Sequence, residues 1–291
     1  MTEHTPRPTS SLKNLLASRR AAILPGTPNA LFARVIAAHG FEAVYVTGAG
    51  IANMSLGAPD IGLVTLTELT EHVTAIADAV DVPILADADT GFGNPVNVAR
   101  TVRLLERAGA AGIQIEDQVF PKKCGHFSGK QVIARDEMVQ KIKAAVDART
   151  DQDLQIAART DARAIEGINA AIARAQAYVE AGADITFVEA PLDIAEMRRI
   201  TGEIAVPQIA NMVFGGLTPP LSQSELGKLG FGGVLYANAA LQAALKSVND
   251  VIAALKRDGS LAQVADRLAG FSERQQAVDK ARYDALEQRY R

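Results

Sequence analysis

The chain has 291 residues, of which 48% are apolar and 22% are charged, as in a globular protein with a sizeable core. Its net charge of -3 gives no basic surface for nucleic acid or for an anionic membrane. A single cysteine cannot form an intrachain disulfide, and the opening segment MTEHTPRPTSS lacks the apolar stretch of a secretory signal. No apolar run approaches the roughly 20 residues that cross a bilayer. We therefore expect a soluble, cytoplasmic protein that acts on a small molecule.

From residue 21 onward, short apolar runs alternate with longer runs whose apolar residues recur every three or four positions. The short runs predict strands over residues 21–26, 43–48, 82–89, 112–117, 154–160, 185–190, 207–212 and 233–238. The longer runs predict helices over residues 29–40, 66–80, 95–109, 135–148, 168–182 and 193–204. Three of these helices end at Gly40, Gly109 and Gly182, and glycine adopts the left-handed helix cap without a steric penalty.

Strands that alternate regularly with helices indicate parallel pairing through helical crossovers, and eight such units close most economically into a barrel. The alternative is an open, doubly wound sheet. That fold typically carries a GxGxxG turn after its first strand, and AAILPGTPNA, residues 21–30, contains none. The sequence therefore predicts an α/β protein with a single (β/α)8 TIM barrel domain spanning residues 1–291.

Both ends of the chain extend beyond the predicted barrel. Residues 1–20, rich in Pro, Ser and Thr at their start, predict a loose arm that leads into a short helix. Residues 260–291 predict a C-terminal helical tail beyond the eighth barrel helix. An amphipathic tail has the same sequence pattern whether it packs on a neighbouring subunit or lies solvated on a monomer, so both arrangements stay open.

Polar residues gather where the predicted strands end. In chain order these strand ends carry Tyr45, Thr47 and Gly48, then Asp87 and Asp89, Glu116 and Asp117, Arg159 and Asp161, Glu189, and finally Asn211. Because the active sites of TIM barrels lie at the C-terminal ends of the strands, these side chains are expected to converge on one site.

The acidic residues among them predict a metal site. Asp87 and Asp89 are two positions apart, so they point to one side of their strand, and Glu116 on the next strand can approach them. Three acids repel one another unless a cation lies among them, and Mg²⁺ or Mn²⁺ bound through carboxylates and waters meets that need. The alternative role of an Asp-x-Asp pair at a strand end is to accept hydrogen bonds in a turn or helix cap.

Arg159 and a small-residue turn provide candidate anion-binding groups. The planar guanidinium of Arg159 can bind a substrate carboxylate with two hydrogen bonds, or form a salt bridge with Glu189. The turn TGAG, residues 47–50, has backbone N–H groups that can converge on a second carboxylate. Tyr45 is a candidate general base if nearby cations lower its pKa, although a strand tyrosine is more often a core residue.

The single cysteine lies in a segment of unusual character, KKCGH, residues 122–126. Lys122, Lys123 and His126 place cationic groups beside Cys124, and such groups favour a thiolate or rapid proton transfer. A lone cysteine is often a small buried hydrophobe, but its neighbours here are polar and show no apolar periodicity. Gly125 and Gly129 suggest a segment that closes over a substrate.

Four segments carry a resemblance to a known family: residues 87–102, 112–130, 156–164 and 211–219. They resemble the isocitrate lyase and phosphoenolpyruvate mutase superfamily, most closely its 2-methylisocitrate lyase-like branch, from about residue 11 to the C-terminus. KKCGH is a specific motif of the lyases in this superfamily. The resemblance implies a (β/α)8 barrel whose eighth helix is exchanged between subunits, a homotetramer built as a dimer of dimers, and Mg²⁺.

The same resemblance implies roles for individual residues. Asp87 resembles the direct metal ligand, with Asp89 and Glu116 holding metal-bound waters and Asp60 close by. Thr47, Gly48, Ala49, Gly125, Arg159, Glu189 and Asn211 resemble the residues that bind the substrate. In such lyases a 2-hydroxy acid loses its hydroxyl proton and the adjacent carbon–carbon bond breaks, which releases a 2-oxo acid and an enolate-like carboxylate. Tyr45 would be the base or orienting group, and Cys124, supported by Lys122 and His126, would protonate the second fragment.

Two departures from the family bear on the substrate. Gln242 stands where 2-methylisocitrate lyases have an arginine for an additional carboxylate, and NMVFGG, residues 211–216, replaces a more polar run. Both changes favour an alkylated malate over 2-methylisocitrate. A carboxyphosphonoenolpyruvate phosphonomutase is the alternative activity, and an oxaloacetate decarboxylase or a barrel that binds a diacid without turnover is less favoured.

Overall fold

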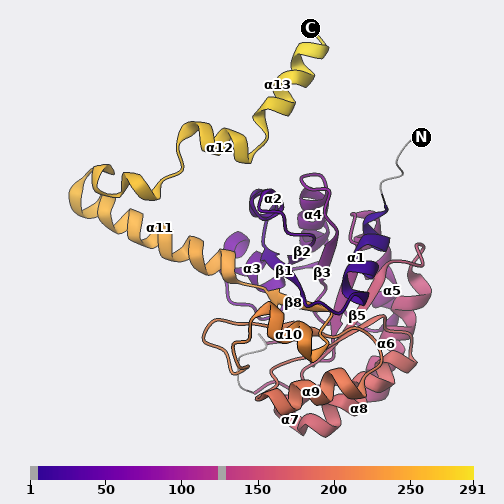
Figure 1. Cartoon of the computed structure of the whole chain (residues 1–291). Coiled ribbons are helices and arrows are strands. Elements are labelled where there is room, and N and C mark those ends of the chain that lie inside the picture. The colour runs from indigo at the N-terminus through magenta and orange to yellow at the C-terminus, as the bar shows by residue number, and fades with distance from the viewer. Residues whose placement is uncertain (1–5, 124–128) are drawn as a thin grey trace.

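The computed structural model describes residues 6–123 and 129–291, and within them it contains a nearly closed barrel of eight parallel strands (Figure 1). The strands are β1 (Ala22–Thr27), β2 (Val44–Val46), β3 (Ile84–Asp87), β4 (Gly112–Glu116), β5 (Gln155–Thr160), β6 (Ile185–Val188), β7 (Ile209–Asn211) and β8 (Gly233–Tyr236). They follow the order β6-β5-β4-β3-β2-β1-β8-β7. All the predicted strands and the TIM barrel are thereby confirmed, and each strand end lies within two residues of its predicted position.

The barrel closes between β6 and β7 through a weaker seam than its other strand pairs. Thr186 pairs with Gln208 in an isolated parallel bridge, and the Thr186 hydroxyl lies 2.5 Å from Gln208 Oε1. By comparison, β4 and β5 run in register over residues 112–116 and 155–159. The seam is therefore held mainly by side chains and one short bridge.

Helices cover the outer face of the barrel. They include α2 (Ala30–Ala38), α4 (Leu66–Ala77), α5 (Pro95–Arg107), α6 (Arg135–Ala148), α7 (Arg163–Glu166), α8 (Ile168–Glu180), α9 (Ile194–Glu203) and α10 (Gln223–Leu229). Side-chain caps start several of them; Thr65 and Glu68 form a reciprocal capping box at α4, for example. The predicted glycine caps are confirmed, because Gly40, Gly109 and Gly182 have φ angles of 78°, 100° and 104°.

A short N-terminal helix, α1 (Pro8–Ala17), closes the N-terminal end of the barrel. Leu12 and Leu16 are fully buried in the apolar cluster that fills the barrel interior. A Cβ atom at Gly112 would lie 2.8 Å from Leu12, and one at Gly233 would lie 2.8 Å from Leu16, so both strands need glycine where α1 packs. The helix predicted near residue 11 therefore packs into the barrel and contributes to its core.

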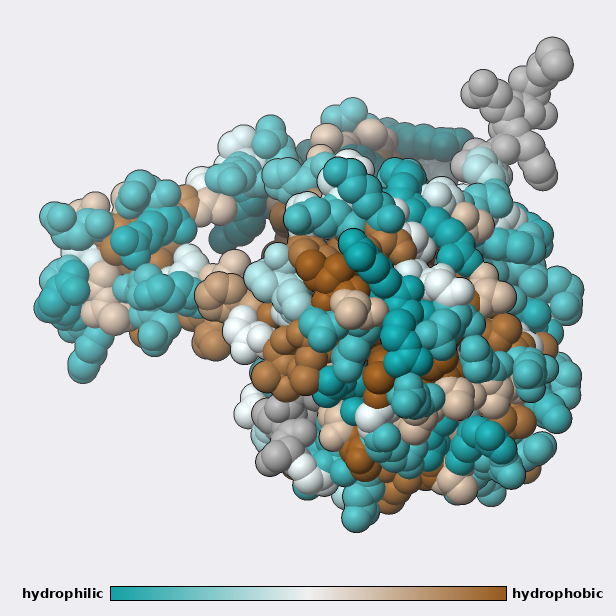
Figure 2. All heavy atoms as spheres, turned by 60° about the horizontal axis from the view of Figure 1, so that its bottom comes forward, coloured by the Kyte–Doolittle hydropathy of each residue, from teal (hydrophilic) through white to brown (hydrophobic). Residues whose placement is uncertain are grey.

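The C-terminal helices extend away from the barrel, as Figure 1 shows for α11 (Ala239–Asp258), α12 (Phe271–Ala277) and α13 (Lys280–Arg289). A turn of 3₁₀-helix over Ala262–Arg267 joins α11 to α12. On α11, Leu245, Val248 and Ile252 are 68%, 58% and 57% exposed. Figure 2 shows apolar surface along this arm as well as on the barrel. The helical tail is confirmed, while its exchange between subunits stays a prediction. Among the described residues, no helix is both long and apolar enough to cross a membrane.

Candidate active site

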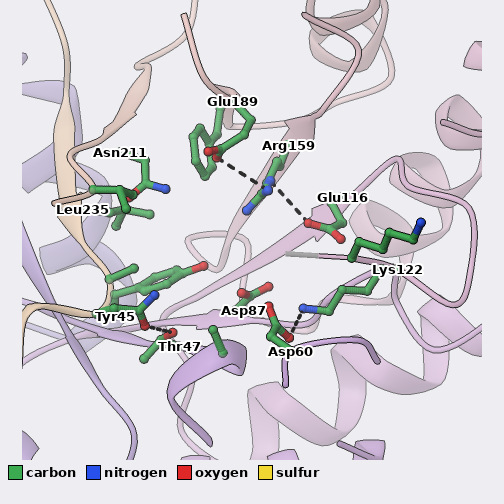
Figure 3. Close-up of a pocket in the computed structure, with 16 residues that line it drawn as sticks. Tyr45, Thr47, Asp60, Asp87, Glu116, Lys122, Arg159, Glu189, Asn211 and Leu235 are labelled. Carbon is green, nitrogen blue, oxygen red and sulfur yellow. Dashed lines mark hydrogen bonds and ion pairs between the residues drawn. The ribbon is translucent and has the colours of Figure 1, made fainter. Parts of the chain in front are cut away.

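A polar pocket opens at the C-terminal ends of the strands, where the sequence predicted the site (Figure 3). Its cavity volume is about 40 Å³. It is lined by Tyr45, Thr47, Ala49, Asp60, Asp87, Glu116, Lys122, Lys123, Arg159, Phe187, Glu189, Asn211, Val213, Leu235, Ala237 and Asn238. Side chains from the ends of β2 to β8 thus meet around one small space.

Arg159 lies at the centre of the carboxylates on β4, β5 and β6. Its Nε atom is 2.9 Å from Asp161 and 3.3 Å from Glu116, and Nη2 is 3.5 Å from Glu189. The guanidinium carbon lies 5.1 Å from the ring centroid of Phe187, within cation–π range. Nη1 forms no hydrogen bond with another described residue, so this donor can serve a ligand in the pocket.

Lys122 forms the second ion-pair cluster. Its ammonium group donates to Asp60, 62 residues earlier in the chain, and lies 2.7 Å from Asp89 Oδ1. The side chain is 4% exposed. Burial acts to lower the pKa of Lys122, but Asp89, Glu116, Asp60 and Asp87 together raise it, so the side chain stays protonated.

Asp87 lies between these two clusters, and two neighbours fix its carboxylate. Its Oδ1 accepts from the Asp89 backbone N–H at 3.1 Å and from Gln114 Nε2 at 3.3 Å. A Cβ atom at Gly48 would lie 3.5 Å from Asp87 Oδ2 and 3.2 Å from Asp89 Oδ1. The glycine at residue 48 therefore keeps space open in front of both carboxylates.

Burial strongly perturbs the acidic groups. It raises the pKa of Asp89 to about 7, although Lys122 opposes the shift. It also raises the pKa of Glu116, with Arg159 opposing. The pKa of Tyr45 is raised as well, first by burial and then by the charge of Asp87. The sequence predicts Tyr45 as a base only if nearby cations lower its pKa. The protein's own groups raise that pKa, which favours the phenol as a neutral hydrogen-bond donor.

The donor set suits a hard divalent cation held partly through water. Glu116 Oε1 is buried with no hydrogen-bond partner among the described residues. Carboxylates outnumber cations: Asp60, Asp87, Asp89, Glu116, Asp161 and Glu189 stand against Lys122, Lys130 and Arg159. Residues 6–123 and 129–291 contain no group of three acidic, His or Cys side chains close enough to form a complete cage. Mg²⁺ usually keeps several waters and binds through one or two carboxylates, so the residues fit it.

The structure brings together the predicted residues Tyr45, Thr47, Ala49, Asp60, Asp87, Glu116, Lys122, Arg159, Glu189 and Asn211 as pocket lining, with Gly48 and Asp89 directly beside them. Cys124, Gly125 and His126 lie outside the described residues. Thr47 caps the four-residue helix α3 (Gly48–Ile51) by accepting from the Gly50 N–H at 3.2 Å, and its hydroxyl lies 3.4 Å from Asn238.

Several residues of the site were missed at the sequence level. Gln114 orients Asp87, Phe187 lies against Arg159, and Lys130 donates to Asp161 Oδ1 at 2.5 Å. Strand alternation carried the signal for two of them, because Gln114 precedes Glu116 by two residues and Phe187 precedes Glu189 by two. Lys130 gave no comparable signal, since it follows a loop and no strand periodicity fixes its direction.

Curated relatives cover nearly the whole chain. A 2,3-dimethylmalate lyase of Eubacterium barkeri is 49% identical over 91% of this chain and 91% of the relative. A 2-methylisocitrate lyase of Aeropyrum pernix is 45% identical over 90% of this chain and 84% of its own. A chloroplastic carboxyvinyl-carboxyphosphonate phosphorylmutase of Arabidopsis thaliana is 40% identical over 98% and 86%.

Solved structures agree with these relatives. The crystal structure of a 2,3-dimethylmalate lyase matches with a TM-score of 0.93 and 33% identity, covering 99% of this chain and 96% of the other. A phosphonopyruvate hydrolase in complex with oxalate and Mg²⁺ matches with a TM-score of 0.88 and 32% identity, covering 98% and 99%. The family described as phosphoenolpyruvate phosphomutase matches residues 12–256. The chain is therefore an enzyme of the phosphoenolpyruvate mutase and isocitrate lyase superfamily.

Proposed function

We propose that the protein is an Mg²⁺-dependent carbon–carbon lyase that cleaves an alkylated malate into a 2-oxo acid and a second carboxylate. The observation that carries the proposal is the pairing, in one buried pocket, of the excess carboxylates around Asp87 and Glu116 with the unused Nη1 donor of Arg159. A dication and a substrate carboxylate complement these two features. The 49% identity to a 2,3-dimethylmalate lyase supports the same conclusion.

Each group in the pocket has a defined task in this proposal. Asp87 would hold the ion directly, while Glu116, Asp89 and Asp60 would hold its waters. The ion, when bound, supplies Lewis-acid activation of the substrate hydroxyl and the developing carbonyl. Arg159 and the turn at Thr47, Gly48 and Ala49 would bind the substrate carboxylates, and Glu189 and Asn211 would fix the other fragment.

The proton transfers follow from the bond that breaks. A base accepts the hydroxyl proton, the C2–C3 bond cleaves, and its electron pair stays on C3 until that carbon is protonated. The raised pKa of Tyr45 supports a role as an orienting donor to the substrate oxygen. Cys124, between Lys122 and His126, would protonate C3, an assignment that rests on the resemblance of KKCGH to the lyase motif.

The substrate preference rests on the charges lining the pocket. 2-Methylisocitrate carries one more carboxylate than 2,3-dimethylmalate. Among the described lining residues, Lys122 already pairs with two carboxylates and Lys123 donates to the Gly129 carbonyl at 3.0 Å. Gln242 is neutral, so it cannot pair with a further substrate carboxylate as an arginine at this position could. A third substrate carboxylate would therefore lose hydration without gaining a partner, which favours the dicarboxylate.

The test is a substrate panel with 2-oxo acid detection. With Mg²⁺, the purified enzyme should release pyruvate from 2,3-dimethylmalate with a higher kcat/KM than from 2-methylisocitrate. EDTA should abolish the release and added Mg²⁺ or Mn²⁺ should restore it. If none of the 2-hydroxy di- and tricarboxylates yields a 2-oxo acid, the lyase proposal is wrong.

A phosphonomutase is the second candidate, because one relative at 40% identity carries that name. Carboxyphosphonoenolpyruvate offered to the enzyme would then be converted to a carbon–phosphorus product, which ³¹P NMR detects directly. Conversion of this compound without cleavage of any malate would favour the mutase over the lyase.

We also propose that the enzyme is a cytoplasmic homotetramer, a dimer of dimers. The exposed apolar residues of α11 support an assembly, because a lone chain would leave them in water. Light scattering on the purified protein measures the number of subunits directly.

A further inference from the structure

A second cavity adjoins the polar pocket on the β7 and β8 side, and its character is different. Its volume is about 280 Å³, against about 40 Å³ for the polar pocket. We call it the apolar chamber, and define it by Met212, Val213, Phe214, Leu221, Tyr236 and Gln242. Val213 and Asn238 line both cavities, so they form the partition between them.

The lining of the chamber determines what can occupy it. Within the described part of the chain, no Lys, Arg, His, Asp or Glu side chain lines it. An ionised group there would lose hydration with no opposite charge beside it, whereas an aliphatic chain would remove apolar surface from water. The polar pocket has the opposite character, because its lining is dominated by carboxylates and their cations.

The position of the chamber indicates which part of the substrate reaches it. The expected metal ligands Asp87 and Glu116 end β3 and β4, so the 2-oxo acid fragment belongs on that side. Asn211 and Val213, at the end of β7, lie on the other side, next to the chamber. With the substrate placed in this way, a substituent on C3, the carbon that leaves with the second carboxylate, would lie on the Val213 side.

We propose that the apolar chamber is a subsite for an unbranched alkyl substituent on C3 of the substrate, longer than the methyl group of 2,3-dimethylmalate. This inference rests on the proposed function and keeps its chemistry: the same C2–C3 bond breaks, and the alkyl group leaves as part of the carboxylate product. The subsite adds ground-state and transition-state binding equally, so it changes KM and leaves kcat nearly constant.

The experiment compares 2-methylmalates that carry methyl, ethyl, propyl or butyl on C3, with pyruvate release as the readout. We expect KM to fall about fourfold for each added methylene until the chamber is full. 2-Methylisocitrate is an internal control, because its C3 substituent is a carboxymethyl group close in size to propyl but charged. Its KM should exceed that of the propyl compound.

Two variants locate the effect. Gln242→Trp, at an exposed position of α11, fills the chamber and should remove the dependence of KM on chain length. Leu221→Trp is the second blocking variant, since Leu221 also lines the chamber. Leu217→Trp is the matched control, since Leu217 is 68% exposed on the same loop and does not line the chamber. The control should keep the wild-type dependence.

The outcomes separate the two proposals. If 2,3-dimethylmalate is cleaved but KM stays flat or rises with chain length, the subsite is wrong and the lyase stands. Retention of the chain-length dependence in both blocking variants would also overturn the subsite. If no member of the series releases pyruvate, the proposed function fails and the subsite with it.

Discussion

At the scale of single residues, Arg159 is the side chain on which the proposed site most depends. Its charge balances Glu116, Asp161 and Glu189, so removing it would leave buried carboxylates unpaired and threaten the fold. Arg159→Lys keeps the charge and loses the planar fork. We expect kcat/KM for the malate substrate to fall about 100-fold in this variant.

The measurement for this prediction is steady-state pyruvate release, with circular dichroism to verify the fold. Arg163→Lys is the matched control, because Arg163 pairs with Glu196 outside the pocket. Similar activity losses in both variants would show that the effect of Arg159→Lys is general and not specific to the substrate.

Tyr45 gives a prediction with a pH readout. Because burial and Asp87 raise the pKa of its phenol, Tyr45 is protonated throughout the neutral range. We expect Tyr45→Phe to lower kcat about tenfold through loss of one hydrogen bond to the substrate, while the shape of the pH–rate profile between pH 6 and pH 9 stays the same. Disappearance of a titrating limb in the variant would instead identify Tyr45 as the general base.

At the scale of elements, α7 and α9 are joined by an ion pair whose strength depends on pH. Arg163 donates to both carboxylate oxygens of Glu196, at 2.8 and 2.9 Å. Burial alone would raise the pKa of Glu196, but the hydrogen bonds from Arg163 and from the Leu192 N–H lower it below its usual 4.5. A lowered folded-state pKa stabilises the protein above the unfolded pKa, and this stabilisation is lost as pH falls through the folded value.

We therefore expect Glu196→Gln to be less stable than wild type by about 1 kcal/mol at pH 6, and the difference to shrink as pH falls below about 4.5. Urea denaturation at several pH values measures it. Glu71→Gln is the control, since Glu71 has no ion pair among the described residues, and its stability at pH 6 should stay within about 0.5 kcal/mol of wild type. A Glu196→Gln difference that grows toward low pH would contradict the sign.

The sequence predicts the strands of the barrel well, but it does not predict where α1 packs. The strands were found because alternating runs of Val, Ile and Ala between helical stretches have few other interpretations, and their polar ends followed from barrel geometry. The packing of α1 into the barrel was not predictable, because an amphipathic pattern shows that a helix packs without showing where. The contact of Lys122 with Asp60 likewise depends on two loops that only the closed barrel brings together.

At the scale of the whole molecule, the arm formed by α11 to α13 leaves Leu245, Val248 and Ile252 of α11 uncovered. If that face forms the proposed subunit interface, Val248→Asp combined with Ile252→Asp should reduce the tetramer to smaller species. Light scattering after size exclusion measures the mass. Asn249→Asp, which adds charge at an exposed position of the same helix, should leave the tetramer intact. An unchanged mass in the double variant would place the interface elsewhere.

The barrel is held together less strongly between β6 and β7 than between the strands from β2 to β5. From β2 to β5, continuous ladders hold the carboxylates that would position a metal, and small shifts there would disturb the chemistry. Glu189 and Asn211 follow the two strands at the seam, where one bridge and one side-chain contact must give way before the strands move apart. A shift at the seam would therefore move Glu189 and Asn211, while the ladders that hold Asp87 and Glu116 stay in place.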